Sequence, residues 1–201
     1  MIYEVIDCEQ GSEEWLMARL GLWTSSNFSN ALTPKFKESV SIKKEEYKLA
    51  SEIICQEIED TFKSSAMERG NELESEALSY FNFLKELDMK TCGFIKNKKG
   101  YGCSPDAINF NIKAGLEIKC PLPKKHIEYV EANILPPEYV LQVQGHMMVT
   151  GFEYWYFMSY HPLIKPLILL VKRDEELISK LHDVLTKSNK TIEEIVERQR
   201  L

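Results

Sequence analysis

The sequence lacks the features that mark several common classes of protein. Its five cysteines are scattered, none forms a C-x-x-C pair, and the four histidines do not stand at zinc-site spacing from them. No run approaches the roughly 18 apolar residues of a membrane-spanning helix. The phosphate-binding pattern G-x-x-x-x-G-K-[ST] is absent as well. These absences argue against a zinc-binding, membrane-spanning or P-loop nucleotide-binding protein, and we expect reduced, mostly packed thiols.

Positive charge is also scarce. Lysine and arginine number 25 against 31 acidic residues, and the formal net charge is -6. This balance disfavours a protein that coats nucleic acid by bulk electrostatics, but a bound cation and a few lysines can reverse the sign at one site. Residues 1–15 are acidic and lack the basic and apolar regions of a signal peptide, so we expect a cytoplasmic protein.

The length of 201 residues, with 44% hydrophobic and 28% charged residues, is that of one globular domain with a sizeable core. We expect a single domain over residues 1–201. Periodicity predicts N-terminal helices within residues 12–62, a core over about 66–172 and a C-terminal helix over 174–199. We also expect strands at 91–97, 101–110, 115–120, 153–161 and 166–171, the last of them buried, and a loop that follows His126 and runs to Pro136.

Residues 102–121 (GCSPDAINFNIKAGLEIKCP) carry the densest group of chemically useful side chains. Asp106 follows a proline, and Glu117 and Lys119 fall on one side of an alternating segment. The polar loop at 111–115 predicts an antiparallel hairpin that brings Asp106 level with Glu117 and Lys119. Two carboxylates held together favour a divalent cation with oxygen ligands. The alternative is a solvated strand face with a cross-strand ion pair.

Two predicted helices place polar side chains toward the interior. In the helix over residues 67–87, Glu74 lies on the apolar stripe, where a carboxylate must be paired, protonated or metal-bound. In the helix over residues 137–150, Gln144 shares a face with apolar residues. Its amide could orient water or a phosphate, or it could bond to the backbone.

The front of the chain offers a candidate anion pocket. Trp15 and Arg19 are four residues apart on a short helix that Ser12 caps, so they share a face. A hydroxyl cluster that includes Thr24 and Ser26 then opens a second short helix. A guanidinium beside hydroxyls at a helix start suits an anion; plain helix capping is the alternative.

The order of these motifs resembles the PD-(D/E)xK nuclease core and, more closely, the phage lambda exonuclease and YqaJ-like viral recombinase family. The segments that carry the resemblance are 10–26 (QGSEEWLMARLGLWTSS), Gly70 with Glu74 and Ala77, 103–106 (CSPD), 116–121 (LEIKCP) and 142–144 (QVQ). The resemblance runs from about residue 10 to about residue 175. It implies an α/β fold with a restriction-endonuclease-like core, in which helices flank a central mixed sheet.

The family resemblance implies a Mg²⁺-dependent exonuclease that degrades linear duplex DNA from its 5′ ends in phage-type homologous recombination. Mn²⁺ would substitute, and one or two ions would act per site. The implied assembly is a homo-oligomeric ring, a trimer, with a single-strand annealing protein as partner and no membrane. If the gene is viral or prophage-borne, the location is the cytoplasm of a bacterial host.

The resemblance also implies roles for individual residues. The implied catalytic residues are Asp106, Glu117, Glu74, Lys119 and Gln144. The implied metal ligands are Asp106, Glu117, Glu74 and the backbone carbonyl of Ile118. The implied receptors of the terminal 5′-phosphate are Arg19, Ser26 and Thr24. The further implied DNA contacts are Trp15, Lys124, Lys125 and Gln142, with packing behind Arg19 as the alternative for Trp15.

Three other functions remain open at this point. An endonuclease on the same core would cut closed circular DNA, which an exonuclease leaves intact. A non-catalytic DNA-binding module would need at least one broken motif, whereas Asp106, Glu117 and Lys119 are all present. A structural protein with a chance hairpin would not need the inward Glu74.

Overall fold

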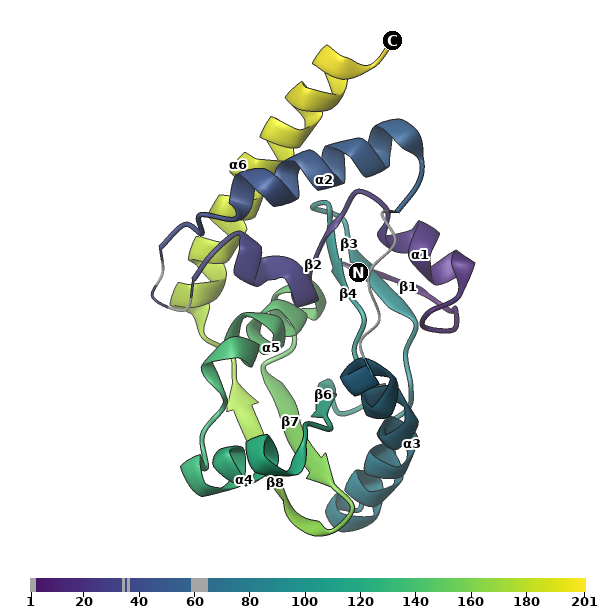
Figure 1. The fold of residues 1–201 in the computed structure, drawn as a ribbon, viewed down its shortest axis with the longest axis vertical. Helices are drawn as coiled ribbons and strands as arrows, with labels where there is room; N and C mark the ends of the chain where they lie inside the picture. The colour runs from purple at the N-terminus through teal and green to yellow at the C-terminus, as the bar shows by residue number, and fades with distance from the viewer. Residues whose placement is uncertain (1–2, 34, 36, 59–64) are drawn as a thin grey trace.

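The strands are divided between two four-stranded sheets. The computed structural model describes residues 3–33, 35, 37–58 and 65–201 (Figure 1). The first sheet has the order β1 (Tyr3–Ile6), β3 (Phe94–Asn97), β4 (Tyr101–Cys103), β2 (Trp23–Thr24). The second has the order β5 (Ala107–Asn109), β6 (Ala114–Lys119), β7 (Tyr154–His161), β8 (Ile164–Lys172). Each sheet contains one parallel pair, β2–β4 and β6–β7, beside antiparallel pairs, so both are mixed.

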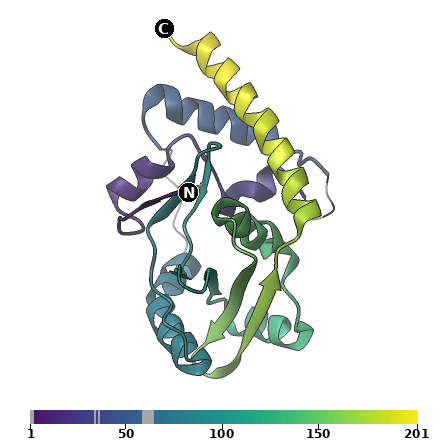
Figure 2. The same ribbon diagram turned by 180° about the vertical axis from the view of Figure 1, so that it is seen from behind.

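Helices flank both sheets, which confirms the predicted α/β class. They are α1 (Glu13–Arg19), the 3-10 helix η1 (Ser25–Asn30), α2 (Ile42–Cys55), α3 (Ser65–Lys85), α4 (Pro123–Ala132), α5 (Pro137–Thr150) and α6 (Glu175–Gln199). Helix α6 packs against α2 and α5 and crosses the back of the molecule (Figure 2). Ser12 caps α1 as predicted, and Gly151 ends α5 with a φ of 75°. In the described part of the chain no helix is long and apolar enough to cross a membrane.

The predicted strand over residues 101–110 is wrong in one respect that matters for the site. It breaks at residues 104–106, so β4 belongs to the first sheet and β5 to the second. Pro105 explains the break, because proline cannot donate a ladder hydrogen bond. The turn leaves Asp106 at the junction of the two sheets.

Three further predictions need correction. Residues 123–132 form helix α4, which replaces the first part of the predicted loop; Pro123 occupies the first turn of this helix, where proline is favoured. Strand β8 is not buried, since Leu167 is its one fully buried residue. Helix α2 ends at Cys55, and the part of the predicted helix at 59–62 lies outside the described residues.

Helix α5 joins the two halves of the fold. It contacts β3 and β4 of the first sheet and β7 of the second. Nine of its residues are buried, including Val143 and Met147, so it is apolar around most of its circumference. The buried polar side chains of this helix, those of Gln144, His146 and Thr150, therefore contact protein atoms.

Candidate active site

The predicted hairpin is confirmed and sets the geometry of the acidic centre. Strands β5 and β6 pair antiparallel, with Ala107 opposite Leu116. Asp106 and Glu117, each one residue further along, therefore lie next to each other. The backbone N–H of Ile118 donates to Asp106 Oδ2 at 2.5 Å, which fixes this carboxylate against β6.

Glu117 is fully buried and both its oxygens have partners. Lys119 Nζ forms an ion pair with Oε1. Gln142 Nε2 donates to the same oxygen at 2.6 Å, and His146 Nε2 lies 2.7 Å from Oε2. Burial alone would raise the pKa of Glu117, but the charge of Lys119 and the hydrogen bond of His146 hold that pKa below its usual value. Glu117 is therefore a fixed, ionised carboxylate at neutral pH.

The other two acids are less easily ionised. Burial raises the pKa of Asp106 well above its usual value; Glu117 and Glu74 raise it further, and Lys119 opposes them. Burial likewise raises the pKa of Glu74, with Lys119 lowering it and Glu117 raising it. The charges of these neighbours shift the pKa of each group, so the structure brings Glu74, Asp106, Glu117 and Lys119 into one electrostatic neighbourhood. Negative charge exceeds positive charge there.

Lys119 is held in its charged form. Burial would lower its pKa, but Glu117 and Asp106 raise it above the usual value. The ammonium also lies 5.4 Å from the centre of the Tyr139 ring. Its side chain is 27% exposed, so it can reach a ligand. A protonated lysine can donate hydrogen bonds and offset negative charge, but it cannot accept a proton.

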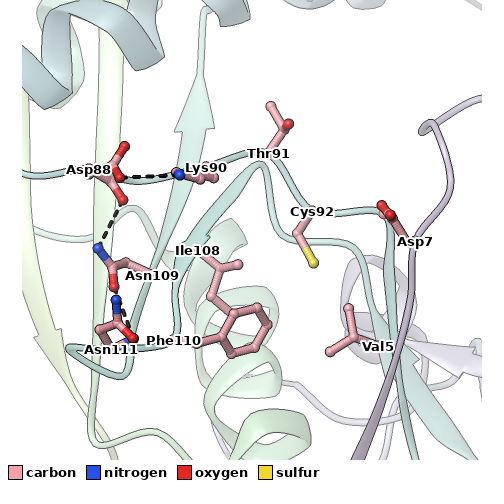
Figure 3. Close-up of a pocket in the computed structure, with 11 residues that line it drawn as sticks. Val5, Asp7, Asp88, Lys90, Thr91, Cys92, Ile108, Asn109, Phe110 and Asn111 are labelled. Atoms are coloured by element: carbon pink, nitrogen blue, oxygen red, sulfur yellow. Dashed lines mark hydrogen bonds and ion pairs between the residues drawn. The ribbon is translucent and has the colours of Figure 1, made fainter.

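Two adjoining cavities lead to the acids. One, of about 270 Å³, is lined by Glu74, Asp106 and the segments 7–10 and 91–93. The other, of about 510 Å³, shares Asp7, Thr91, Cys92 and Gly93 with the first and continues toward Phe110 (Figure 3). Burial raises the pKa of Cys92 to about 11, so its thiol stays protonated at neutral pH. The carboxylates are therefore the groups in this groove that can serve as anionic ligands.

The donors at the acidic centre are oxygen atoms. Asp106 and Glu117 offer carboxylates, and Ile118, which directly follows Glu117 in sequence, offers its backbone carbonyl. Within the described residues, no three His, Cys, Asp or Glu side chains are grouped closely enough to hold a metal by themselves. A cation here would need the carbonyl or water to complete its shell. An all-oxygen set with two carboxylates suits a hard divalent cation.

The predicted anion pocket is also assembled. Arg19 Nη2 lies 3.4 Å from both Thr24 Oγ1 and Ser26 Oγ, and these hydroxyls are 3.0 Å apart. The guanidinium carbon stacks over the Trp15 ring, 3.9 Å from its centre. Burial lowers the pKa of Arg19, and Glu52 opposes that shift. The cluster thus presents a cation and two hydroxyls, and Trp15 packs behind Arg19.

Hydrogen bonds tie this pocket to the acidic centre. Trp15 Nε1 donates to Ser104 Oγ at 2.8 Å. Gln10 Nε2 donates to the carbonyl of Pro105 at 2.9 Å and to that of Cys92 at 2.7 Å. Both anchors hold the turn that carries Asp106. Neither Gln10 nor Ser104 was expected from the sequence to position the site, although both fall within the segments that carry the resemblance.

Of the two roles expected for Gln144, the structure shows the bonds to the backbone and not the catalytic role. Its amide donates to the carbonyl of Lys172 at 2.9 Å and accepts from the N–H of Asp174 at 2.9 Å. Both ends of the side chain therefore hold the β8–α6 connection. The residue that reaches Glu117 is Gln142, which was expected to contact DNA.

The two lysines of α4 are exposed and do not line the cavities beside the acids. Lys125 lies 3.5 Å from Glu128 and 3.6 Å from Glu138. Its charge is therefore already partly offset. Lys124 and Lys125 as DNA contacts remain predictions.

His146 is the site residue that sequence reasoning missed. Its side chain is fully buried, and its ring stacks on Trp155 at 4.8 Å with an interplanar angle of 10°. Ser25 Oγ lies 3.3 Å from Nδ1, on the side away from Glu117. Gln142 and His146 are four residues apart and share a face of α5. That spacing was a usable signal.

Comparison with known proteins agrees with this fold. Two structures of the alkaline exonuclease LHK-Exo from Laribacter hongkongensis are 27% identical to the chain and cover 93% of it and 95% of their own length. The TM-scores are 0.83 for its complex with dAMP and 0.84 for the other structure. A phage-related exonuclease from Haemophilus somnus 129PT has a TM-score of 0.71 at 13% identity, over 88% of this chain and 96% of its own, and shows the fold alone.

No curated protein sequence matches the chain significantly. The profile of the YqaJ-like viral recombinase domain, in contrast, matches residues 14–153. This range contains Arg19, Glu74, Asp106, Glu117 and Lys119. The chain belongs to the YqaJ-like viral recombinase family.

Proposed function

We propose that this protein is a Mg²⁺-dependent exonuclease that degrades linear duplex DNA in the 5′-to-3′ direction. The observation that carries the proposal is the convergence of Glu74, Asp106, Glu117 and Lys119 beside a cavity, with the Arg19 pocket tied to the same turn. Family membership and the similarity to LHK-Exo, which is described as an alkaline exonuclease, support it.

The acidic centre fits a magnesium ion. Asp106, Glu117 and the carbonyl of Ile118 would hold it, with Glu74 serving a second ion directly or through water, and Mn²⁺ would substitute. Burial and then the neighbouring carboxylates of Glu117 and Glu74 raise the pKa of Asp106, and a cation would favour its ionised form. Such an ion would supply Lewis-acid polarisation of the phosphate and would lower the pKa of bound water.

The chain's own side chains hold the reacting groups in place. Lys119 stays protonated, so it donates hydrogen bonds to the attacking water or the phosphate and offsets the charge that develops in the transition state. Glu117 cannot rotate freely because Gln142 and His146 occupy its two oxygens. A fixed carboxylate loses little entropy when a ligand binds.

The pocket of Arg19, Thr24 and Ser26 would receive the terminal 5′-phosphate. A guanidinium matches a phosphate in shape and charge, and the hydroxyls add hydrogen bonds. This pocket would give the enzyme its polarity, because a 5′ end carries the phosphate that it recognises.

The same proposal includes assembly into a homo-oligomeric ring of three subunits. It also includes a single-strand annealing protein as partner in recombination. Both parts rest on family resemblance. Size-exclusion chromatography with light scattering tests the ring. A protein that stays monomeric at all concentrations and still degrades DNA processively would refute it.

The function is tested with linear and closed circular duplexes in Mg²⁺, each linear end carrying 5′-phosphate or 5′-hydroxyl. We expect mononucleotides from phosphorylated linear DNA and intact circles. Glu117→Gln and Lys119→Ala should lower cleavage by at least about 10³-fold and leave the circular dichroism spectrum unchanged. Cutting of closed circles would favour the endonuclease alternative, and no cleavage under any condition would favour a non-catalytic DNA-binding module.

A further inference from the structure

A separate cavity lies at the opposite end of β4 from Asp106. It has a volume of about 640 Å³ and is lined by residues 21–22, the β3–β4 turn at 98–100 and one face of α6. The amide of Asn189 is 3.4 Å from the carbonyl of Lys99, and Tyr101 Oη is 3.4 Å from His182 Nδ1. These contacts hold α6 against the turn. The cavity is therefore part of the folded scaffold.

The cavity concentrates positive charge in a chain whose net charge is -6. Lys98, Lys99 and Lys190 line it, and Glu193 is the one acidic residue among the lining residues. None of these three lysines forms an ion pair with another described residue, whereas Lys125 does. Three unpaired ammonium groups around one concave surface attract an anion.

Neutral donors complete the lining. Lys99 Nζ lies 3.3 Å from His182 Nε2, and Thr186 and Asn189 line the cavity beside them while donating to the carbonyls of His182 and Lys99. Burial lowers the pKa of His182 and the charge of Lys99 lowers it further, against the opposing effect of Asp183. Lysines with hydroxyl and amide donors are the groups that bind phosphate oxygens.

We propose that this cavity binds backbone phosphates of the DNA duplex at a distance from the cleaved end. The inference rests on the proposed function. Strands β2 and β4 are parallel, with Thr24 opposite Gly102, so the pocket for the 5′ end adjoins β4. The five steps from Tyr101 to Asp106 span at most about 17 Å. Since backbone phosphates rise by about 3.4 Å per step, a bound duplex can present its backbone here about five steps from the end.

The test is the salt dependence of duplex binding. We would compare wild type, the double variant Lys99→Ala/Lys190→Ala and the control Lys85→Ala/Lys165→Ala, which removes two exposed lysines elsewhere. Binding of a fluorescent 5′-phosphorylated duplex is followed by anisotropy over a range of KCl, in EDTA to prevent cleavage. A plot of log K for duplex binding against log salt has a negative slope, and each lost phosphate contact reduces the magnitude of this slope by about 1. We expect the magnitude to fall by about 2 for the cavity variant and to stay unchanged for the control.

The possible outcomes distinguish a failure of this inference from a failure of the proposed function. An unchanged slope in the cavity variant, with wild type binding the duplex normally, overturns this inference and leaves the proposed function standing. Wild type that does not bind duplex at any salt concentration overturns both. Isothermal titration with inorganic phosphate and with a polyglutamate peptide covers other anions. If the cavity variant loses binding to either of them while its duplex slope is unchanged, the ligand is not DNA. Equal melting temperatures of the two variants confirm that folding is intact.

Discussion

The hydrogen bond between His146 and Glu117 allows a sharp prediction about the replacement His146→Ala. The two groups are 2.7 Å apart, and their side chains are 0% and 1% exposed. Alanine removes the partner of Oε2 and leaves part of a buried carboxylate unsatisfied. Breaking such a pair costs about 3–5 kcal/mol. Loss of the stacking on Trp155 adds about 0.5–1.5 kcal/mol.

A loss of stability of this size is large, but we expect the variant still to fold. In a domain of this length, 1 kcal/mol corresponds to about 2–4 °C in melting temperature. We therefore expect His146→Ala to melt roughly 10 °C or more below wild type. His146→Gln keeps an N–H donor near Oε2 and should lose less. Thermal and urea unfolding followed by circular dichroism measure both effects.

A second buried histidine provides the control. His126 is also fully buried, but it contacts Ser159 and the carbonyl of Lys165 instead of an acid. His126→Ala should cost about 1–3 kcal/mol and leave kcat unchanged well below the melting temperature. His146→Ala should lower kcat about 10–100-fold with little change in KM, because Glu117 loses its fixed orientation, and His146→Gln should restore part of it. Wild-type kcat in folded His146→Ala would refute the reasoning.

Three further outcomes are expected. Arg19→Ala should lower the cleavage rate on 5′-phosphorylated ends about 10–100-fold and on 5′-hydroxyl ends much less, and Arg19→Lys should not restore the rate, because lysine lacks the planar fork of the guanidinium. Competition between the two substrates measures this preference. Unchanged discrimination would place the phosphate pocket elsewhere. Asp106→Asn should abolish cleavage yet raise the melting temperature of metal-free protein at pH 8. Because the pKa of Asp106 is raised, the stability that this residue contributes is present at low pH and is lost as pH rises through that pKa. The gain in melting temperature of Asp106→Asn should therefore disappear in acid. A gain that does not depend on pH would contradict this prediction. Trp15→Phe keeps a ring under Arg19 but removes the N–H that donates to Ser104, so it should lower the free energy of unfolding in urea by about 0.5–1.5 kcal/mol. Stability equal to that of wild type would show that this hydrogen bond is not formed in solution.

Local patterns allowed much of the site to be predicted. The β5–β6 hairpin follows from alternation and a polar loop, and both signals lie within twenty residues. The stacking of Arg19 on Trp15 follows from helical spacing. In each case the interacting groups are close in sequence, so the backbone period alone decides which side chains meet.

Helix α5 shows where such reasoning fails. Because it is buried on several sides, its apolar pattern does not single out one inward face. The apolar pattern nevertheless favours Gln144 as the inward amide, whereas Gln142 is the residue that reaches Glu117. The choice depends on where β6 and the β8–α6 connection pack against the helix, and that is long-range information. The break at Pro105 is similar, since pairing β4 and β5 with different sheets depends on partners far away in sequence.

The connection between the two clusters gives the proposed direction of cleavage a structural basis. Ser104, which holds Trp15 behind Arg19, is two residues before Asp106, so their backbones lie within about 7 Å. A second connection runs from Asp106 through its neighbour Glu117 to His146 and then Ser25, which lies between Thr24 and Ser26 in sequence. The pocket for the end and the acids for cleavage are thus fixed to each other by two short routes. Loosening either route should change where the strand is cut relative to its end more than how tightly that end is bound.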